Sequence, residues 1–225
     1  PALGQSLVKG LSDAFRVVVF DYEGHVLGTP KPDTLTPANA TTDFLAVADA
    51  AGADRFAYYG YSWLAVLGLQ LAIRTDRLLA LIMGGFLPLG GPYEEMLRVT
   101  TATNDMASAA QSTAQPSQAP DESEWSGVSL SKDQTRQFVT LYQALQGFDY
   151  RAAQARITCP RLCFVGSADK IQYGKSWGDV HVSFAGPIVR GRAQLEDLGW
   201  DVRVLDGLDH TQAMQATQVV PILRS

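Results

Sequence analysis

The sequence has 225 residues, of which 46% are hydrophobic and 18% are charged. This composition is typical of a folded domain with one substantial core, and it excludes a disordered, collagen-like or disulfide-stapled chain. Eighteen Lys and Arg against 23 Asp and Glu give a net charge of -5, and no run of Lys or Arg occurs. We therefore expect neither nucleic acid nor a membrane surface as a partner.

The sequence features that bear on location point to a reducing compartment. Cys159 and Cys163 stand four residues apart in what reads as a strand, where extended backbone separates them by about 13 Å, too far for a disulfide. No cationic start followed by an apolar segment opens the sequence, so we expect a cytoplasmic protein. The uncharged stretch 56–73 is close to the lower length limit of a membrane span, but its aromatic start and small polar elbow favour a buried strand, turn and helix.

Strand-like apolar runs alternate with helical segments in the first half of the sequence, which predicts the α/β class, a largely parallel sheet flanked by helices. The run Val17–Val19 indicates a strand that is buried on both faces. Thr36 and Pro37 are typical of a helix start, and Gly52 of a helix end. In chain order, we expect a helix at 4–13, a strand at 15–20, a helix at 36–52, a strand at 55–61, a helix at 63–75 and a strand at 78–83.

The second half begins with a change of character. From 99 to 131, Ser, Thr, Ala, Gln and Pro dominate without a persistent period, which predicts a linker-like or mobile segment. Helical spacing returns at 132–146, and strands are predicted at 161–165 and 201–205, separated by a helix at 187–198. A last helix follows His210 until Pro221 interrupts it.

Ser62 stands at the predicted junction of a strand and a helix, in Gly60-Tyr61-Ser62-Trp63-Leu64. A tight turn there lifts the hydroxyl above the sheet edge and points the start of the helix at it, as a nucleophile requires. The backbone N–H of Trp63 is free to stabilise an oxyanion. Alone, such a triplet more often marks a serine that caps a helix.

An acid and a histidine follow other predicted strands, at the edge where open α/β sheets assemble their sites. Asp169 follows the strand at 161–165, and His210 follows the strand at 201–205. A hydroxyl needs an imidazole to accept its proton and a carboxylate to orient the imidazole, so we interpret Ser62, His210 and Asp169 as a catalytic triad. His25 and His181 are the alternative bases, while Asp206 and Asp209 more plausibly shape the loop.

Taken together, these motifs resemble the α/β-hydrolase family, from about Gly4 to the end. The matching pieces are 17–25, the elbow around Ser62, Gly166–Asp169, and Asp209–His210 with the two residues after it. The resemblance implies an eight-stranded, mostly parallel sheet with a helical cap, divided into a core at 1–90 and 156–225 and a cap insertion at 91–155. It also implies that the triad hydrolyses an ester or a similar acyl substrate.

The sequence departs from the family pattern at three places. Leu64 stands where the elbow usually ends in Gly, and Glu23 stands in a motif that usually carries Arg. The family's further N-terminal strands, with a His-Gly turn that supplies the second oxyanion donor, do not occur in this sequence, which begins at Pro1. One of those strands lies between the strands at 15–20 and 55–61, and each orphaned ladder group would cost about 1–3 kcal/mol. We therefore expect this sequence to be a portion of a longer protein.

We expect a serine hydrolase that cleaves a small apolar carboxylic ester through an acyl-enzyme. The candidate substrate-binding residues are Tyr61, Leu87, Phe138 and Tyr142. A lactone or carbon-carbon bond hydrolase with the same triad is one alternative, and a non-catalytic protein that binds a small ligand on the same scaffold is another. The scattered histidines and the two cysteines lack the spacing of a zinc site, so we expect no metal and no cofactor. The oligomeric state is not indicated.

Overall fold

The computed structural model describes residues 2–113 and 130–225. Within them, the centre of the molecule is a parallel sheet of four strands in the order β1-β2-β3-β6. The strands are β1 (Phe56–Tyr61), β2 (Leu78–Gly84), β3 (Arg161–Gly166) and β6 (Trp200–Leu205). A separate antiparallel pair is formed by β4 (Lys170–Gln172) and β5 (His181–Ser183). The predicted α/β class is confirmed, although the described chain contributes four strands to the main sheet where the resemblance implied eight.

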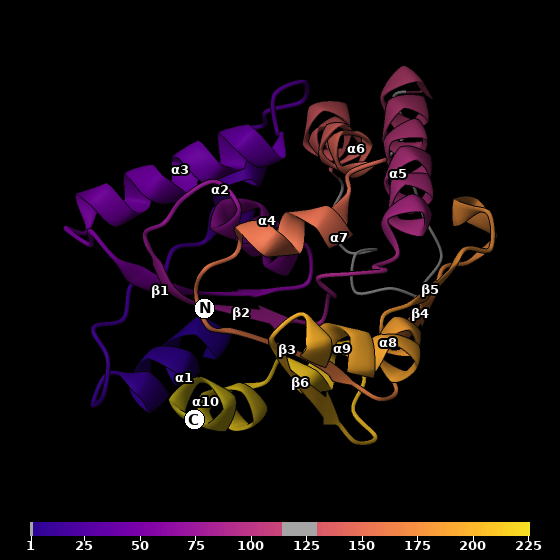
Figure 1. Cartoon of the computed structure of the whole chain (residues 1–225). Coiled ribbons are helices and arrows are strands. Elements are labelled where there is room, and N and C mark those ends of the chain that lie inside the picture. Colours follow the sequence, from indigo (N-terminus) through magenta and orange to yellow (C-terminus); the bar gives the residue numbers. More distant parts are fainter. Residues whose placement is uncertain (1, 114–129) are drawn as a thin grey trace.

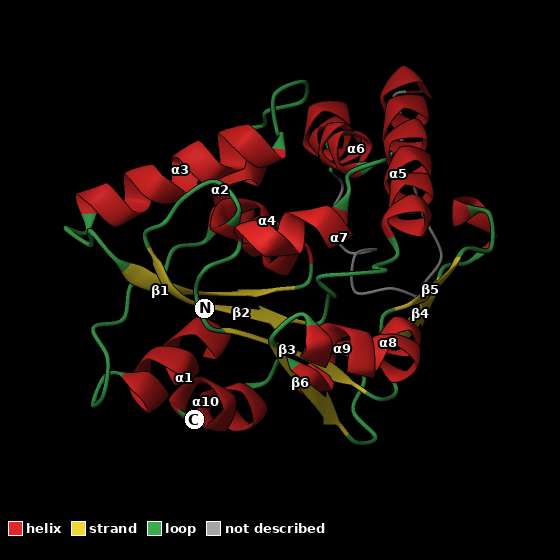
Figure 2. Cartoon of the chain, in the orientation of Figure 1, coloured by secondary structure: helices red, strands yellow, loops and turns green. Residues whose placement is uncertain are grey.

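Helices cover both faces of the sheet (Figures 1 and 2). On one face lie α1 (Ala2–Leu11) and α10 (Ala216–Arg224), which pack on Phe164 of β3 in a small apolar cluster. The opposite face belongs to the main core, with α3 (Pro37–Ala50), α4 (Trp63–Ala72) and α8 (Ala185–Asp197). The remaining helices are α2 (Tyr22–Gly28), α5 (Tyr93–Thr113), α6 (Lys132–Leu145), α7 (Tyr150–Ala153), η1 (Gln154–Arg156), η2 (Lys175–Trp177) and α9 (His210–Ala213).

The β1-α4-β2 unit forms as predicted, and its helix is buried on almost every side. Nine of the ten residues of α4 are buried. Gly68 lets α4 lie against β1, since a Cβ there would lie 2.4 Å from the Tyr58 ring. In α3, the Thr36 side chain accepts a hydrogen bond from the Asn39 N–H and Pro37 occupies the first turn. The predicted helix start at 36 is therefore confirmed.

The prediction of a buried strand at 15–20 is wrong. This segment has no strand assignment, and Phe15, Val18 and Val19 are each about half exposed. A strand is stable when its backbone groups pair with a neighbour. β1 forms one edge of the sheet, and no strand among the described residues pairs with 15–20. The apolar run therefore remains extended without becoming part of the sheet.

The prediction of a linker-like segment at 99–131 is also wrong for its first half. Residues 99–113 belong to the 21-residue helix α5, and 114–129 lie outside the described residues. The small polar side chains are accommodated because their hydroxyls donate to carbonyls of the preceding turn. Thr100 donates to Met96 O, Thr103 to Val99 O and Ser108 to Asn104 O. A hydroxyl-rich helix thus lacks the apolar period by which helices are usually predicted.

One smaller expectation for the last third of the chain is corrected. Pro221 does not interrupt the last helix but lies inside α10, which is held by the buried Val219 and Ile222; the break falls between α9 and α10 instead.

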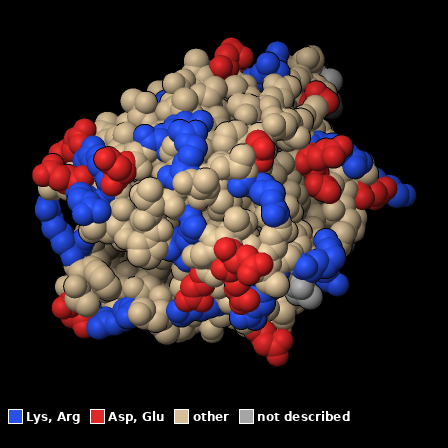
Figure 3. Space-filling model, viewed as in Figure 1, with Lys and Arg blue, Asp and Glu red and all other residues tan. Residues whose placement is uncertain are grey.

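The surface carries both signs of charge. On the face shown in Figure 3, Lys and Arg are interspersed with Asp and Glu. Among the described residues, none of the helices combines the length and apolar character needed to cross a bilayer.

Candidate active site

Ser62 occupies a strained turn between β1 and α4. Its backbone has φ 57° and ψ -132°, and it is one of two residues other than glycine with a positive φ in the described chain. The Ser62 N–H donates to Gly84 O at 2.8 Å, which fixes the turn to the end of β2. Such strain at a serine between a strand and a helix is the geometry of a nucleophile elbow.

Gly60 is required by the tightness of this elbow. A Cβ at Gly60 would lie 2.5 Å from the Leu64 carbonyl oxygen. The turn therefore stays narrow although Leu64 replaces the usual glycine, and the Leu64 side chain packs partly buried against the main core. Helix α4 begins at Trp63, so the Trp63 N–H has no acceptor within the helix and is available to an oxyanion.

Asp169 and His210 form a close pair. His210 Nδ1 lies 2.8 Å from one carboxylate oxygen of Asp169 and 3.0 Å from the other. The Asp169 side chain is fully buried, while that of His210 keeps 18% of its surface exposed. Donation from Nδ1 to the carboxylate leaves Nε2 as the acceptor nitrogen of a neutral imidazole. His25 and His181, the alternative bases, lie on α2 and β5 and have no such carboxylate partner among the described residues.

Two loops meet closely to form this pair. Gly166 ends β3, and a Cβ there would lie 2.0 Å from the Leu208 carbonyl oxygen in the loop after β6. The Ala168 N–H donates to the same oxygen at 3.0 Å. Asp209 caps α9 by accepting from the backbone N–H groups of Thr211 and Gln212. Its carboxylate therefore shapes the loop, as the sequence indicated.

The charge state of Asp169 is set by opposing effects. Burial raises its pKa above the ordinary value, while the hydrogen bond from His210 and the attraction of its ring lower it. The net shift is upward. The hydrogen bond from His210 thus favours the carboxylate form of Asp169 against the effect of burial.

The predicted triad residues follow three strands whose carboxyl ends lie at the same edge of the sheet, with β3 and β6 running two residues beyond the level of β1. The sheet pairs Tyr61 with Gly84, Gly84 with Phe164, and Gly166 with Leu205. Ser62, Asp169 and His210 come after these ends, at one edge of the sheet. No hydrogen bond joins the Ser62 hydroxyl to His210 among the described residues; the elbow reaches His210 through Tyr61, whose ring centroid is 5.1 Å from that of His210.

The four predicted substrate-binding residues lie in different surroundings. Tyr61 donates its hydroxyl to the backbone carbonyl of His210 at 2.7 Å. Leu87 and Tyr142 are buried in the main core. Phe138 on α6 packs edge-on against the Trp63 ring, with centroids 5.3 Å apart, which brings α6 next to the residue after Ser62.

Glu23 lies in the same neighbourhood, a placement that the sequence reasoning missed. The Trp63 indole N–H donates to the Glu23 carboxylate at 3.4 Å, and burial is the main cause that raises the pKa of Glu23. The sequence signal was the acidic residue in a motif that usually carries Arg. A carboxylate therefore lies beside the aromatic side chain that follows the elbow.

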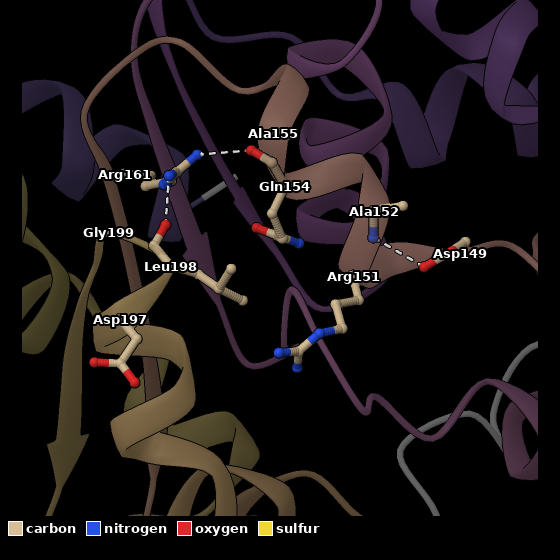
Figure 4. Close-up of a pocket in the computed structure, with 9 residues that line it drawn as sticks. All are labelled: Asp149, Arg151, Ala152, Gln154, Ala155, Arg161, Asp197, Leu198 and Gly199. Carbon is tan, nitrogen blue, oxygen red and sulfur yellow. Dashed lines mark hydrogen bonds between the residues drawn. The ribbon is translucent and has the colours of Figure 1, made fainter.

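A shallow hollow of about 650 Å³ lies away from this edge, at the amino ends of β3 and β6 (Figure 4). The Arg161 guanidinium there donates to the carbonyls of Gln154, Ile157 and Leu198. These hydrogen bonds connect η1 to the end of α8. Arg161 therefore has a structural role, and the hollow lies between the elements that its side chain connects. Within residues 2–113 and 130–225, no group of three or more His, Cys, Asp or Glu is arranged to hold a metal ion.

Comparison with solved structures places this arrangement in a known fold. The chain is similar to a putative α/β-hydrolase family protein from Desulfitobacterium hafniense, at 14% identity and a TM-score of 0.59, covering 99% of this chain and 88% of the other. It is also similar to a thermophilic esterase from Thermogutta terrifontis, at 16% identity, a TM-score of 0.58 and coverage of 99% and 83%. An N-acyl homoserine lactonase matches at 12% identity, a TM-score of 0.53 and coverage of 86% and 70%.

The sheet topology and the comparisons with solved structures show that this chain has the α/β-hydrolase fold. Searches against protein-family models and against curated protein sequences each found no match.

Proposed function

We propose that this chain is a serine hydrolase of small apolar carboxylic esters, with Ser62 as nucleophile, His210 as base and Asp169 as the group that orients His210. The observation that carries the proposal is the pairing of His210 Nδ1 with the buried Asp169 at the sheet edge where Ser62 has its strained elbow backbone. A structural serine that only caps a helix has no need of a positive φ.

The reaction follows from these positions. Ser62 Oγ attacks the ester carbonyl carbon while His210 Nε2 takes the hydroxyl proton, and Asp169 stabilises the imidazolium. The Trp63 N–H binds the oxyanion. The intermediate then expels the alcohol, which receives the proton from His210. Water, activated by the same imidazole, attacks the acyl-Ser62 ester, releases the carboxylic acid and restores the hydroxyl.

The proposed binding region is apolar with one carboxylate. Trp63 and Phe138 supply aromatic surface next to the elbow, and we assign residues 91–155 the role of a cap, with α6 carrying Phe138 to Trp63. Leu87 and Tyr142 support this region from the core. Glu23 beside Trp63 disfavours an anionic acyl group, because its carboxylate would repel it.

Hydrolysis of p-nitrophenyl esters of increasing acyl length tests the proposal. We expect turnover of the short esters, and we expect Ser62→Ala, His210→Ala and Asp169→Asn each to lower kcat by about 10⁴-fold. The matched control is Ser12→Ala, a serine in the turn after α1 whose hydroxyl donates to Val8 O. It should keep wild-type kcat. Wild-type turnover that persists in Ser62→Ala would contradict the proposal.

A lactone is an internal ester, so the same steps would open a lactone ring. Comparing kcat/KM for an acyl lactone with that for the open ester of equal acyl length separates the two substrates. If the folded protein binds these compounds without turning any of them over, a non-catalytic role on the same scaffold is the correct reading.

A further inference from the structure

Tyr61, the residue before Ser62, connects the elbow to the loop that carries His210. Its hydroxyl donates to the His210 carbonyl oxygen at 2.7 Å, and the two rings lie 5.1 Å apart at an interplanar angle of 58°. The two residues are 149 positions apart in the sequence. Since Tyr61 is bonded directly to Ser62, this contact is a short mechanical link between the two triad positions.

The end of β2 leaves room for the Tyr61 ring. A Cβ at Gly84 would lie 2.5 Å from Tyr61 Cδ2, and a Cβ at Gly85 would lie 2.6 Å from Tyr61 Cζ and 2.9 Å from its oxygen. Gly85 also has φ +65°, a conformation that other residues rarely adopt. Two consecutive glycines therefore let the ring pass the end of β2 and approach Phe164 on β3, at 6.0 Å between centroids.

The hydroxyl of Tyr61 remains a donor at any working pH. Burial raises the pKa of Tyr61 far above its ordinary value, and the nearby Asp169 and Asp209 carboxylates raise it further. The phenol therefore stays protonated, and its hydrogen bond to His210 O is a constant restraint.

Among the contacts of His210, which include the Phe184 ring with centroids 5.0 Å apart, three hydrogen-bonded groups fix different parts of the residue. Asp169 orients the ring nitrogen, and the Asp209 cap fixes the residue before it. Tyr61, the last residue of β1, ties the His210 backbone to that strand. Asp169 follows β3, which is separated from β1 by β2.

We propose that Tyr61 is a positioning residue: its phenol ties the His210 main chain to β1 and thereby sets the spacing of His210 from Ser62. This inference rests on the proposed function, because it takes Ser62 and His210 as nucleophile and base. It differs from the expectation that Tyr61 contacts substrate. Proton transfer depends steeply on such spacing, since a displacement of about 1 Å can cost about 100-fold in rate.

The test is Tyr61→Phe, which keeps the ring and removes the hydroxyl. The matched control is Tyr59→Phe. Tyr59 lies on the same strand, its ring stacks on the same Phe164 with centroids 6.2 Å apart, and its hydroxyl has no hydrogen bond among the described residues. We expect Tyr61→Phe to lower kcat for p-nitrophenyl butyrate by about 10- to 100-fold with KM changed by less than about twofold. Tyr59→Phe should keep wild-type kcat.

A second readout does not require turnover. In ¹⁵N-labelled protein, the Nδ1 proton of His210 gives a low-field NMR signal through its bond to Asp169, and His210→Ala assigns the signal by removing it. We expect this signal to shift or broaden in Tyr61→Phe and to stay unchanged in Tyr59→Phe. If wild type hydrolyses no ester, the proposed function fails, yet the signal still reports whether Tyr61 holds His210.

The outcomes separate the roles of Tyr61. A higher KM with unchanged kcat would assign Tyr61 to substrate binding and overturn the inference, as would wild-type kcat together with an unchanged His210 signal. Gly85→Ala provides a second route if Tyr61→Phe folds poorly, because it displaces the ring and retains the hydroxyl. It should lower kcat and perturb the same signal, and an unperturbed signal in folded Gly85→Ala would count against the link.

Discussion

Ser62 holds a backbone conformation that a side chain disfavours, with φ 57° and ψ -132°. Residues held in such regions cost about 1–3 kcal/mol, and that cost persists where function requires it. Glycine adopts positive φ without a clash between its Cβ and the backbone, because it has none. The strain at Ser62 can therefore be measured as a difference in stability between two variants that both lack the hydroxyl.

We predict that Ser62→Gly unfolds at higher urea concentration than Ser62→Ala, by about 1 kcal/mol in the free energy of unfolding. Both variants lack the hydroxyl, so activity does not enter the comparison. Equal stability, or a more stable alanine variant, would mean that the elbow is not strained.

The titration of Glu23 makes the folding stability of the protein depend on pH. Burial is the main cause that raises its pKa in the folded protein, so folding favours the protonated form and the charged form is penalised. The penalty is absent at low pH and grows as the pH rises through the raised pKa. Glu23→Gln removes the charge and keeps an oxygen that can accept from Trp63.

We therefore expect Glu23→Gln to raise Tm at about pH 7 and to leave it nearly unchanged at about pH 4. Glu94→Gln, at an exposed glutamate in the first turn of α5, controls for the loss of one surface charge. If Glu23→Gln raised Tm by the same amount at both pH values, burial of the Glu23 charge would not be the cause of the stabilisation.

At the scale of elements, the loops after β3 and β6 form one unit. The carbonyl oxygen of Leu208 lies where a side chain on Gly166 would begin, at 2.0 Å from an ideal Cβ. Gly166→Ala must push these loops apart and break the bond from the Ala168 N–H to Leu208 O. Asp169 and His210 then lose their spacing.

We predict that Gly166→Ala lowers kcat by about 100-fold and also lowers Tm. Gly174→Ala is the control, because no atom lies within 4 Å of the Cβ position at Gly174. Wild-type kcat in Gly166→Ala would show that the pair of loops tolerates separation.

Sequence patterns predicted the elements whose apolar residues follow a local pattern. The strands at 56–61, 78–84, 161–166 and 200–205 and the helix α4 show such patterns, and their signal does not depend on distant residues. Helix α5 was not predicted from residue 99 onward, because its hydroxyl side chains donate hydrogen bonds within the helix and give no apolar period. The strand predicted at 15–20 does not form, although its sequence is apolar. An apolar run becomes a strand only when its backbone pairs with a neighbouring strand.

For the candidate site, sequence patterns indicated candidate members but not the contacts that link them. Strand ends and residue types were enough to single out Ser62, Asp169 and His210, and the Asp169–His210 pair is present at 2.8 Å. The contacts of Tyr61 with His210 and of Glu23 with Trp63 join residues 149 and 40 positions apart. A single sequence holds no signal for such pairs, because they depend on the packing of whole elements.

For the whole molecule, the sheet brings three strand ends to one edge, and the two helical layers hold it there. The account depends on one chemical claim, that the hydroxyl of Ser62 is an activated nucleophile. Ordinary serine hydroxyls do not react with mild phosphonylating reagents, because they lack an adjacent base and oxyanion donors.

A fluorophosphonate probe tests this claim most directly, with the adduct located by mass spectrometry of the digested protein. The account predicts one phosphonyl group per chain on the peptide that carries Ser62, slower labelling in His210→Ala, and none in Ser62→Ala. Folded wild-type protein that remains unlabelled, or that carries the adduct on another serine, would contradict it.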